Sequence, residues 1–138
     1  MDAAQTARLF YRLFNERRLD EASELVDPQA IFHYVPSRQR LIGRAGYRAL
    51  AAAWLQAFAD ARLELTVVRA IDEETIDVEF IGHGTHTGEL VLGETVTVPA
   101  TGRAAHLPFH ERLVVRHGLV VSSELTFDLD ELKKRLFG

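Results

Sequence analysis

The stretch that decides the fold is Arg62–Leu90, which reads RLELTVVRAIDEETIDVEFIGHGTHTGEL. Apolar and polar residues alternate on both sides of an acidic turn at residues 72–74, with Leu63, Leu65 and Val67 before the turn and Ile76, Val78 and Phe80 after it. A period of two is typical of half-buried strands. The stretch therefore predicts two long strands, the second running toward Leu90, with an apolar face that other elements must cover.

The chain beyond Leu90 predicts two further long strands, Arg103–Arg116 and Leu119–Phe127. They flank His117-Gly118, a pair that fits a two-residue hairpin turn. The segment Gly93–Gly102 contains a proline, so we expect a loop or an irregular edge there.

Before Arg62, apolar residues recur mostly at the three- and four-residue intervals of a helix. Asp2 and Gln5 form a capping-box pattern, and the residues after them predict an amphipathic helix of about four turns. A short helix after Asp20 is expected to stop at Asp27-Pro28, because the residue before a proline avoids helical angles.

A strand at Ala30–Val35 and a third helix that opens at Gly43–Gly46 complete this part. At the other end, a cap pattern at Asp128 predicts a short last helix that ends at Gly138. Helices that precede a run of antiparallel strands are typical of an α+β fold. We expect a single domain over residues 1–138, a cone-shaped curved antiparallel sheet wrapped around N-terminal helices, with an apolar pocket between them.

Composition narrows the function classes. Sixteen Lys and Arg against twenty Asp and Glu give a net charge of −4, so no surface for nucleic acid or for an anionic membrane is expected. The absence of cysteine removes disulfides and thiolate chemistry. The most apolar stretch, Ala49–Ala59, is shorter than the about 20 residues that span a bilayer. No apolar signal core follows Met1, and we expect a cytoplasmic protein.

Two short motifs narrow the fold to a family. Residues 84–89 read Gly-Thr-His-Thr-Gly-Glu, and residues 99–103 read Pro-Ala-Thr-Gly-Arg. Together with the order of elements, they resemble the SnoaL-like polyketide cyclase or ester cyclase family of the nuclear transport factor 2-like superfamily. Residues 57–60 (Ala-Phe-Ala-Asp) resemble that family's helix-to-strand junction, and the similarity covers nearly the whole chain.

The resemblance implies a cofactor-independent enzyme that forms a homodimer or a higher homo-oligomer. In the family's cyclases, an aspartate late in the last strand is the general acid–base group of an intramolecular aldol ring closure. Leu125 stands at that position here, and Glu124 precedes it. This departure supports an alternative, a module of the same fold that binds a small molecule or dimerises without turnover.

Glu111 and Glu124 are the first catalytic candidates. A turn at His117-Gly118 places Glu111 opposite Glu124, and two adjacent carboxylates would share a proton near neutral pH. A register shifted by one would instead pair Arg112 with Glu124 as a surface ion pair. Leu113 shares a face with Glu111, which favours an inward Glu111, whereas the period places Glu124 on the solvent face. Both registers remain open.

His86 is the third catalytic candidate. It shares the parity of Gly82 and Gly84 and of the inward residues of the same predicted strand. Glycines leave space on that face and allow the strand to bend, so His86 could project into the pocket and protonate a substrate carbonyl. The other interpretation is that the glycines curl the sheet and His86 bonds a neighbouring strand.

Aromatic residues are expected to line the pocket. The predicted substrate contacts are His33, Tyr34, Tyr47, Trp54, Phe58, Phe80, Phe109 and Leu125. Tyr47 and Trp54 lie at helical spacing, which also fits plain core packing. His33 and Tyr34 are neighbours on a strand, so only one of them can face the helices.

A metal site is not expected. His83 and His86 lie on opposite faces of a strand, and Pro108 separates His106 from His110, whereas a metal needs ligands on one face and a third group.

The leading hypothesis is therefore a small enzyme of the cyclase, isomerase or hydrolase type, without a cofactor. It would act on a small apolar carbonyl-bearing molecule by general acid–base chemistry. His86 and Glu111 would move protons, with Glu124 as an outside candidate. A non-catalytic binding or dimerisation module is the alternative, and a metal-dependent enzyme is a distant third.

Overall fold

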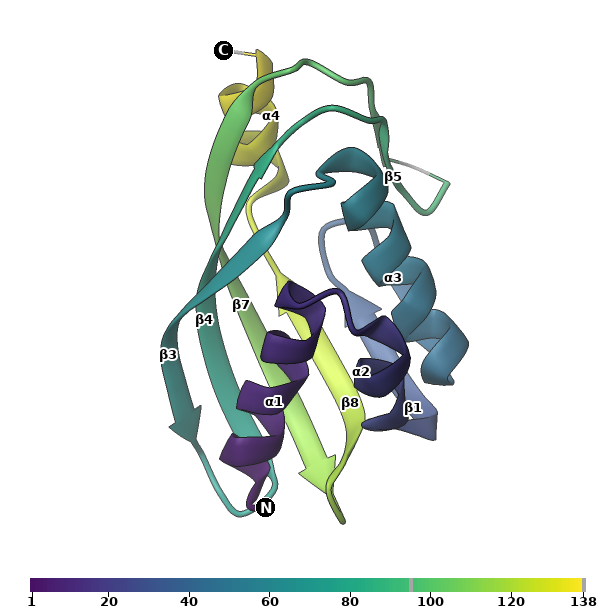
Figure 1. Ribbon diagram of the computed structural model, residues 1–138, viewed down its shortest axis with the longest axis vertical. Helices are drawn as coiled ribbons and strands as arrows, with labels where there is room; N and C mark the ends of the chain where they lie inside the picture. The colour runs from purple at the N-terminus through teal and green to yellow at the C-terminus, as the bar shows by residue number, and fades with distance from the viewer. Residues whose placement is uncertain (95, 138) are drawn as a thin grey trace.

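The computed structural model describes residues 1–94 and 96–137 and shows a curved sheet with helices on its concave face (Figure 1). The elements in chain order are α1 (Ala3–Asn15), α2 (Leu19–Glu24), β1 (Val26–Tyr34), β2 (Gln39–Ile42), α3 (Gly43–Ala57), β3 (Arg62–Ala70), β4 (Thr75–Thr85), β5 (Leu90–Leu92), β6 (Val96–Val98), β7 (Ala104–Arg116), β8 (Leu119–Thr126) and α4 (Leu129–Phe137). Within the described ranges, each helix is too short or too polar to cross a bilayer.

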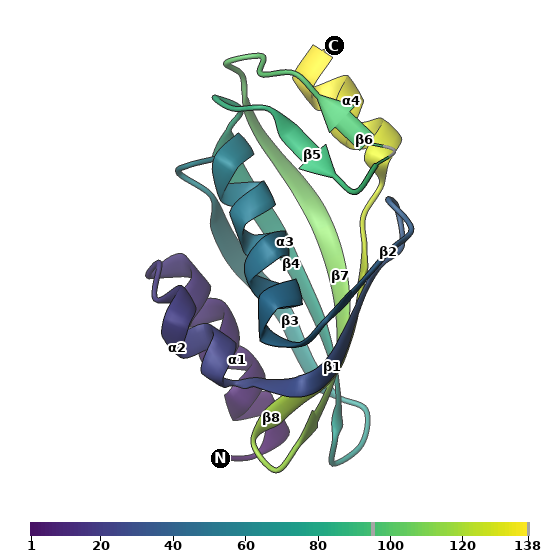
Figure 2. The ribbon, with the colours of Figure 1, turned by 90° about the vertical axis from the view of Figure 1, so that its right-hand side faces the viewer.

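The main sheet has the strand order β2-β1-β8-β7-β4-β3, and β5 and β6 form a separate small sheet. Strands β1 and β8 run parallel, and the other neighbours in the main sheet run antiparallel. Helix α1 packs against β3 and β7, and α3 packs against β1 (Figure 2). The α+β class and the curved sheet around N-terminal helices are thus confirmed, but the expectation of an antiparallel sheet is wrong for β1 and β8.

Asn15 joins the end of α1 to the start of β3. Its Nδ2 donates to the Leu63 carbonyl at 2.9 Å, and its Oδ1 accepts from the Leu63 N–H at 2.8 Å. Arg17 adds hydrogen bonds to the carbonyls of Ala59 and Ala61. These bonds fix the level at which α1 meets the sheet, and so the position of Tyr11 one turn earlier.

The second helix ends earlier than the sequence predicts. Strand β1 already begins at Val26, so Asp27-Pro28 lies inside a strand rather than ending a helix. The pairing between β1 and β8 is interrupted between Val26 and Ile31, and a proline there breaks no ladder bond. The short strand β2, which pairs with the end of β1, was not predicted.

The strand predicted to run toward Leu90 ends at Thr85, because the chain leaves the sheet at His86. The His86 N–H donates to the Arg103 carbonyl. The segment between these two residues, which we call the excursion, leaves the main sheet and carries β5 and β6. Strand β6 lies within Gly93–Gly102, where a loop or an irregular edge was expected. Thr95 in that range and Gly138 at the expected end of the last helix lie outside the described residues.

The excursion docks on the end of α3. The N–H groups of Thr87 and Gly88 both donate to the Ala57 carbonyl, at 3.0 and 3.1 Å. A Cβ at Gly88 would lie 2.0 Å from the Gln56 carbonyl oxygen, so only glycine fits this close approach. A contact between segments this far apart in sequence draws the chain out of the sheet.

The β7–β8 hairpin turns at His117-Gly118 as predicted, with φ values of 53° and 74° that suit a type I′ turn. A bulge near the turn then shifts the ladder by one residue. Glu111 therefore lies opposite Leu125, and Arg112 lies opposite Glu124. The predicted pairing of Glu111 with Glu124 is wrong, and the shifted register is the one that forms.

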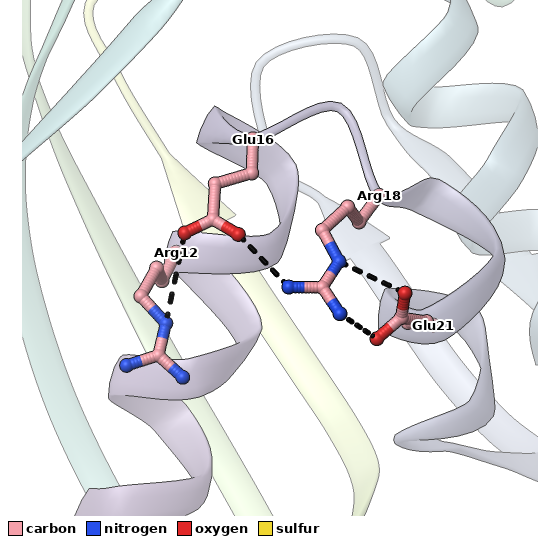
Figure 3. A network of polar contacts seen from close by, with 4 residues as sticks. All are labelled: Arg12, Glu16, Arg18 and Glu21. Atoms are coloured by element: carbon pink, nitrogen blue, oxygen red, sulfur yellow. Dashed lines mark hydrogen bonds and ion pairs between the residues drawn. The ribbon is translucent and has the colours of Figure 1, made fainter.

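Charged side chains link α1 to α2 at the surface (Figure 3). The Glu16 carboxylate lies 3.9 Å from Arg12 Nε and 3.1 Å from Arg18 Nη1, and Arg18 binds Glu21 through two nitrogens at 2.8 and 2.5 Å. These groups are roughly half exposed, and exposed ion pairs contribute little to stability. We assign no ligand to this network.

We expect Asn15→Ala to lower the free energy of unfolding by about 1–2 kcal/mol, because it leaves two part-buried backbone groups of Leu63 without partners. Asn15→Asp keeps the acceptor for the Leu63 N–H but places a carboxylate oxygen against the Leu63 carbonyl, so it should also be destabilised. Urea unfolding of both variants, with the exposed Arg12→Ala as control, tests this. An Asn15→Ala protein as stable as the wild type would contradict it.

Candidate active site

A cavity of about 120 Å³ lies between the concave face of the sheet and helices α1 and α3. Its wall is formed mainly by aromatic and aliphatic side chains, and the few polar groups include Glu111 and three tyrosines. A concave apolar pocket with a few convergent polar groups is the first place to look for a binding or catalytic site.

Most of the predicted contact residues reach this cavity. Those in its wall are Tyr34, Tyr47, Trp54, Phe58, Phe80, Phe109 and Leu125. The expected contact from His33 is wrong, because Tyr34 takes the inward face of β1 and turns its neighbour outward.

Glu124 also lies outside the cavity. Its side chain is 61% exposed on the outer face of the sheet, where an oxygen lies 3.9 Å from His33 Nδ1. The candidate role of Glu124 in the pocket is therefore wrong. The register places Leu125, not Glu124, on the inward face beside Glu111.

Glu111 brings a carboxyl group into the apolar cavity. It is buried on β7, and its two oxygens accept hydrogen bonds from the Tyr11 hydroxyl of α1 and the Ser123 hydroxyl of β8. Burial raises the pKa of Glu111, and the two hydrogen bonds oppose that rise because they favour the carboxylate. The result is a carboxyl that takes up a proton at higher pH than an exposed glutamate.

The local structure explains why these three groups meet. Glu111 and Leu113 alternate with outward residues on β7, and Ser123 lies directly opposite Leu113 on β8. Ser123 is thus the diagonal neighbour of Glu111 on one face. Tyr11 lies on the buried side of α1, which packs against β7.

Two further tyrosines surround the carboxyl. The Tyr34 hydroxyl accepts a hydrogen bond from Trp54 Nε1 at 2.8 Å, whereas the buried Tyr47 hydroxyl has no partner among the described residues. Burial first, and then the negative charge of Glu111, raise the pKa of Tyr11, Tyr34 and Tyr47. All three phenols therefore keep their protons and can donate hydrogen bonds.

His86 is fully buried but does not line the cavity. Its Nδ1 lies 3.1 Å from Thr101 Oγ1, and its ring stacks on Phe58 at 5.1 Å. Burial lowers the pKa of His86, so the ring stays neutral. The expectation that His86 projects into the pocket is wrong, because the strand ends one residue earlier. The other interpretation fits in part: His86 has a structural position behind the Phe58 wall, but its ring bonds Thr101, which precedes β7, and not a neighbouring strand.

Tyr11 and Ser123 are the polar partners that the sequence analysis missed. Tyr11 lies at helical spacing from Ala7 and Phe14, inside the apolar stripe of α1, and a buried tyrosine hydroxyl needs a partner. Ser123 alternates with the outward Glu124, so the period of two already placed it inward. Both signals were present, but neither names the partner.

Within residues 1–94 and 96–137, no three His, Asp or Glu side chains gather closely enough to hold a metal ion. His83 and His106 do face each other on β4 and β7, with ring centroids 6.0 Å apart. His83 is bound to Glu64 at 2.9 Å.

Comparison with protein families identifies one match. Residues 7–123 match the model of the SnoaL-like domain, which confirms the family resemblance. No curated protein matches the chain.

Solved structures with the same fold come from several bacteria. A proposed polyketide cyclase from Xanthomonas campestris pv. campestris has a TM-score of 0.81 at 21% identity, with 97% of this chain and 96% of that chain covered. A proposed polyketide cyclase from Streptomyces antibioticus has a TM-score of 0.81 at 19% identity, with 99% of each chain covered. A proposed hydroxylase from Streptomyces galilaeus has a TM-score of 0.77 at 23% identity, with 97% and 96% covered. These likenesses establish the fold.

The raised pKa of Glu111 predicts a pH dependence of stability. The folded state holds the Glu111 proton more tightly than the unfolded chain, whose ordinary value is 4.5. This residue therefore favours folding most below that value, and the contribution is lost as the pH rises through the raised pKa.

Urea unfolding of the wild type and Glu111→Gln at acidic and alkaline pH measures this effect. The free energy of unfolding of the wild type, relative to the variant, should fall as the pH rises. Glu124→Gln, which removes an exposed carboxylate, is the matched control. A constant difference for Glu111→Gln, or one that grows with pH, would contradict the expected shift.

Proposed function

This chain belongs to the SnoaL-like domain family, and we propose that it is an enzyme that applies general acid–base chemistry to a small apolar substrate with a carbonyl group. The observation that carries the proposal is the Glu111 carboxyl, which is buried in the wall of an apolar cavity and has a raised pKa. A carboxyl pKa that rises toward the working pH favours efficient proton transfer in both directions.

The proposed reaction begins with the removal of a proton from the carbon next to the substrate carbonyl. The Glu111 carboxylate takes the proton, the C–H electron pair forms a carbon–carbon double bond, and the carbonyl oxygen becomes an enolate. In an isomerisation, Glu111 returns the proton to a different carbon. In a ring closure, the enolate carbon bonds to a second carbonyl, whose oxygen takes the proton from Glu111.

The other polar groups have separate roles in this scheme. The Tyr47 hydroxyl has a proton and no partner among the described residues, so it can donate to the enolate oxygen as the charge develops. Tyr11 and Ser123 hold both oxygens of Glu111 and act as positioning residues. The aromatic walls exclude water, which strengthens these interactions.

The position of Glu111 supports the role that the resemblance assigns to the last strand. Glu111 lies directly opposite Leu125, and both line the cavity. Residues directly opposed in a sheet have Cβ atoms about 4.5–5.5 Å apart. A carboxyl at position 111 therefore serves the same part of the cavity as one at position 125. Ring closure is a reaction consistent with the proposed polyketide cyclases among the similar structures.

A second candidate is a module that binds a small molecule without turnover. One observation favours it, because both oxygens of Glu111 already accept hydrogen bonds from the protein. A fully partnered buried carboxyl can serve structure alone. The homo-oligomeric state and the cytoplasmic location stay predictions.

We expect the wild type to accelerate deuterium exchange next to the carbonyl of cyclohexanone in D₂O, as followed by proton NMR. Glu111→Gln keeps the shape but cannot accept a proton, so it should lower the exchange rate by about 10²–10⁴-fold. Glu124→Gln should exchange at the wild-type rate.

The outcomes separate the two candidate functions. A wild-type rate equal to that of buffer, with cyclohexanone bound, favours the binding module. Full exchange by Glu111→Gln removes Glu111 from the mechanism while leaving the protein an enzyme.

Tyr47→Phe should lower the exchange rate constant at saturation by about 10²–10³-fold and weaken binding by no more than about tenfold, since its hydrogen bond to the carbonyl oxygen strengthens as charge develops. Tyr11→Phe is the comparison variant. It removes a hydrogen bond that lowers the pKa of Glu111, so it should shift the pH profile of the rate to higher pH. Identical effects of the two variants would contradict these separate roles.

A further inference from the structure

The size and polarity of the cavity limit what it can hold. We propose that its ligand has a single six-membered ring with at least one oxygen substituent, a hydroxyl or a carbonyl, and is not a fused polycyclic compound. This proposal rests on the proposed function, because it names the substrate class of the same cavity.

The volume of the cavity is the first argument. The space is about 120 Å³, whereas a dry cavity of about 150 Å³ in another protein holds one benzene molecule. Pockets for drug-sized ligands usually have volumes of about 300–1,000 Å³. One ring therefore fills this cavity with little room to spare.

The walls hold the cavity at this size. A Cβ at Gly82 would lie 2.8 Å from Phe109 Cε1, and a Cβ at Gly84 would lie 2.9 Å from Phe58 Cβ. Phe109 and Phe58 therefore already rest against bare sheet backbone and cannot retreat outward. Phe109 also stacks on Phe80, with ring centroids 5.0 Å apart and an interplanar angle of 3°.

A second set of contacts holds the part of the wall that α3 supplies. Trp54 lies between Phe58, Phe109 and Phe127, with ring centroids 5.5 to 6.2 Å apart. Its indole N–H is tied to Tyr34. Interlocked rings of this kind cannot swing aside one at a time without opening a void. The small volume is thus a property of the packing.

The polar groups specify one oxygen on the ligand. The Tyr47 hydroxyl is buried without a partner, and the Tyr34 hydroxyl accepts from Trp54 but donates to no acceptor within the described residues. Both tyrosines lie in the cavity wall with Glu111. An oxygen substituent on the ligand's ring can accept hydrogen bonds from these hydroxyls, whereas a hydrocarbon ligand would leave the hydroxyls unpaired.

The single tryptophan of the chain offers a direct measurement of binding. Trp54 gives one indole N–H signal in a ¹H–¹⁵N spectrum, and this N–H binds the hydroxyl of Tyr34, which lines the cavity together with Trp54. We would titrate the wild type with phenol, toluene, 2-naphthol and 9-phenanthrol. We expect phenol to shift the signal with an affinity at least about tenfold above that of 2-naphthol, and 9-phenanthrol to leave it unmoved. Toluene lacks the oxygen and should bind about tenfold more weakly than phenol.

Two variants change the volume of the cavity in opposite directions. Phe109→Ala removes a wall ring, so it should bind 2-naphthol more tightly than phenol. Gly82→Ala pushes Phe109 into the cavity and should weaken phenol binding about tenfold. If either variant fails to fold, the wild-type titrations still test the proposal. Tighter binding of 2-naphthol or 9-phenanthrol than of phenol by the wild type would overturn the one-ring limit, and equal binding of phenol and toluene would overturn the oxygen requirement.

These titrations fail or succeed independently of catalysis. Phenol binding in the expected order without cyclohexanone exchange would support the ligand class and reject the acid–base proposal. A preference for fused rings together with exchange that depends on Glu111 would reject the ligand class and support the acid–base proposal.

Discussion

The buried carboxyl of Glu111 is the constraint on which the rest of the structure depends. Moving a carboxylate out of water costs several kcal/mol unless the protein supplies partners. Hydrogen bonds to a charged group return about 1.5–3 kcal/mol each, and Glu111 receives two, from Tyr11 and Ser123. These partners belong to α1 and β8, so one carboxyl ties the first helix to the two strands of the hairpin. The site and the core are therefore assembled by the same contacts.

The apolar walls make this carboxyl chemically distinct from those on the outer face. Aromatic rings line the same cavity, and two of them rest against the sheet at Gly82 and Gly84, which carry no side chain. Low local polarity raises the pKa of Glu111 and of the tyrosines near it. Proton acceptor and proton donors thus coexist in one small space. Asp77, on the outer face, is bound by Arg112 in two hydrogen bonds and keeps a lowered pKa.

Sequence periodicity predicted the fold and the inward residues of straight strands, but not the points where the chain leaves a strand. The choice between His33 and Tyr34 and the inward position of Glu111 follow from a period of two. The pairing of Glu111 depended on a bulge that shifts the ladder, which no local pattern marks. His86 was misplaced because Gly88 docks on the end of α3. That contact joins distant segments, and strand parity carries no information about it.

The leucine at position 125 has a consequence for the acid beside it. Directly opposed residues on adjacent strands lie on the same face of a sheet and at the same height along it. A carboxyl can therefore reach one point in the cavity from either of the two strands. Two carboxylates on opposed residues would share a proton and split their titration. Leu125 instead places an apolar side chain directly opposite Glu111, which leaves a single acid at this level of the sheet. The position on β7 also places this acid within reach of Tyr11. The absence of an acid at position 125 is therefore compatible with the proposed acid–base chemistry, in which Glu111 is the carboxyl.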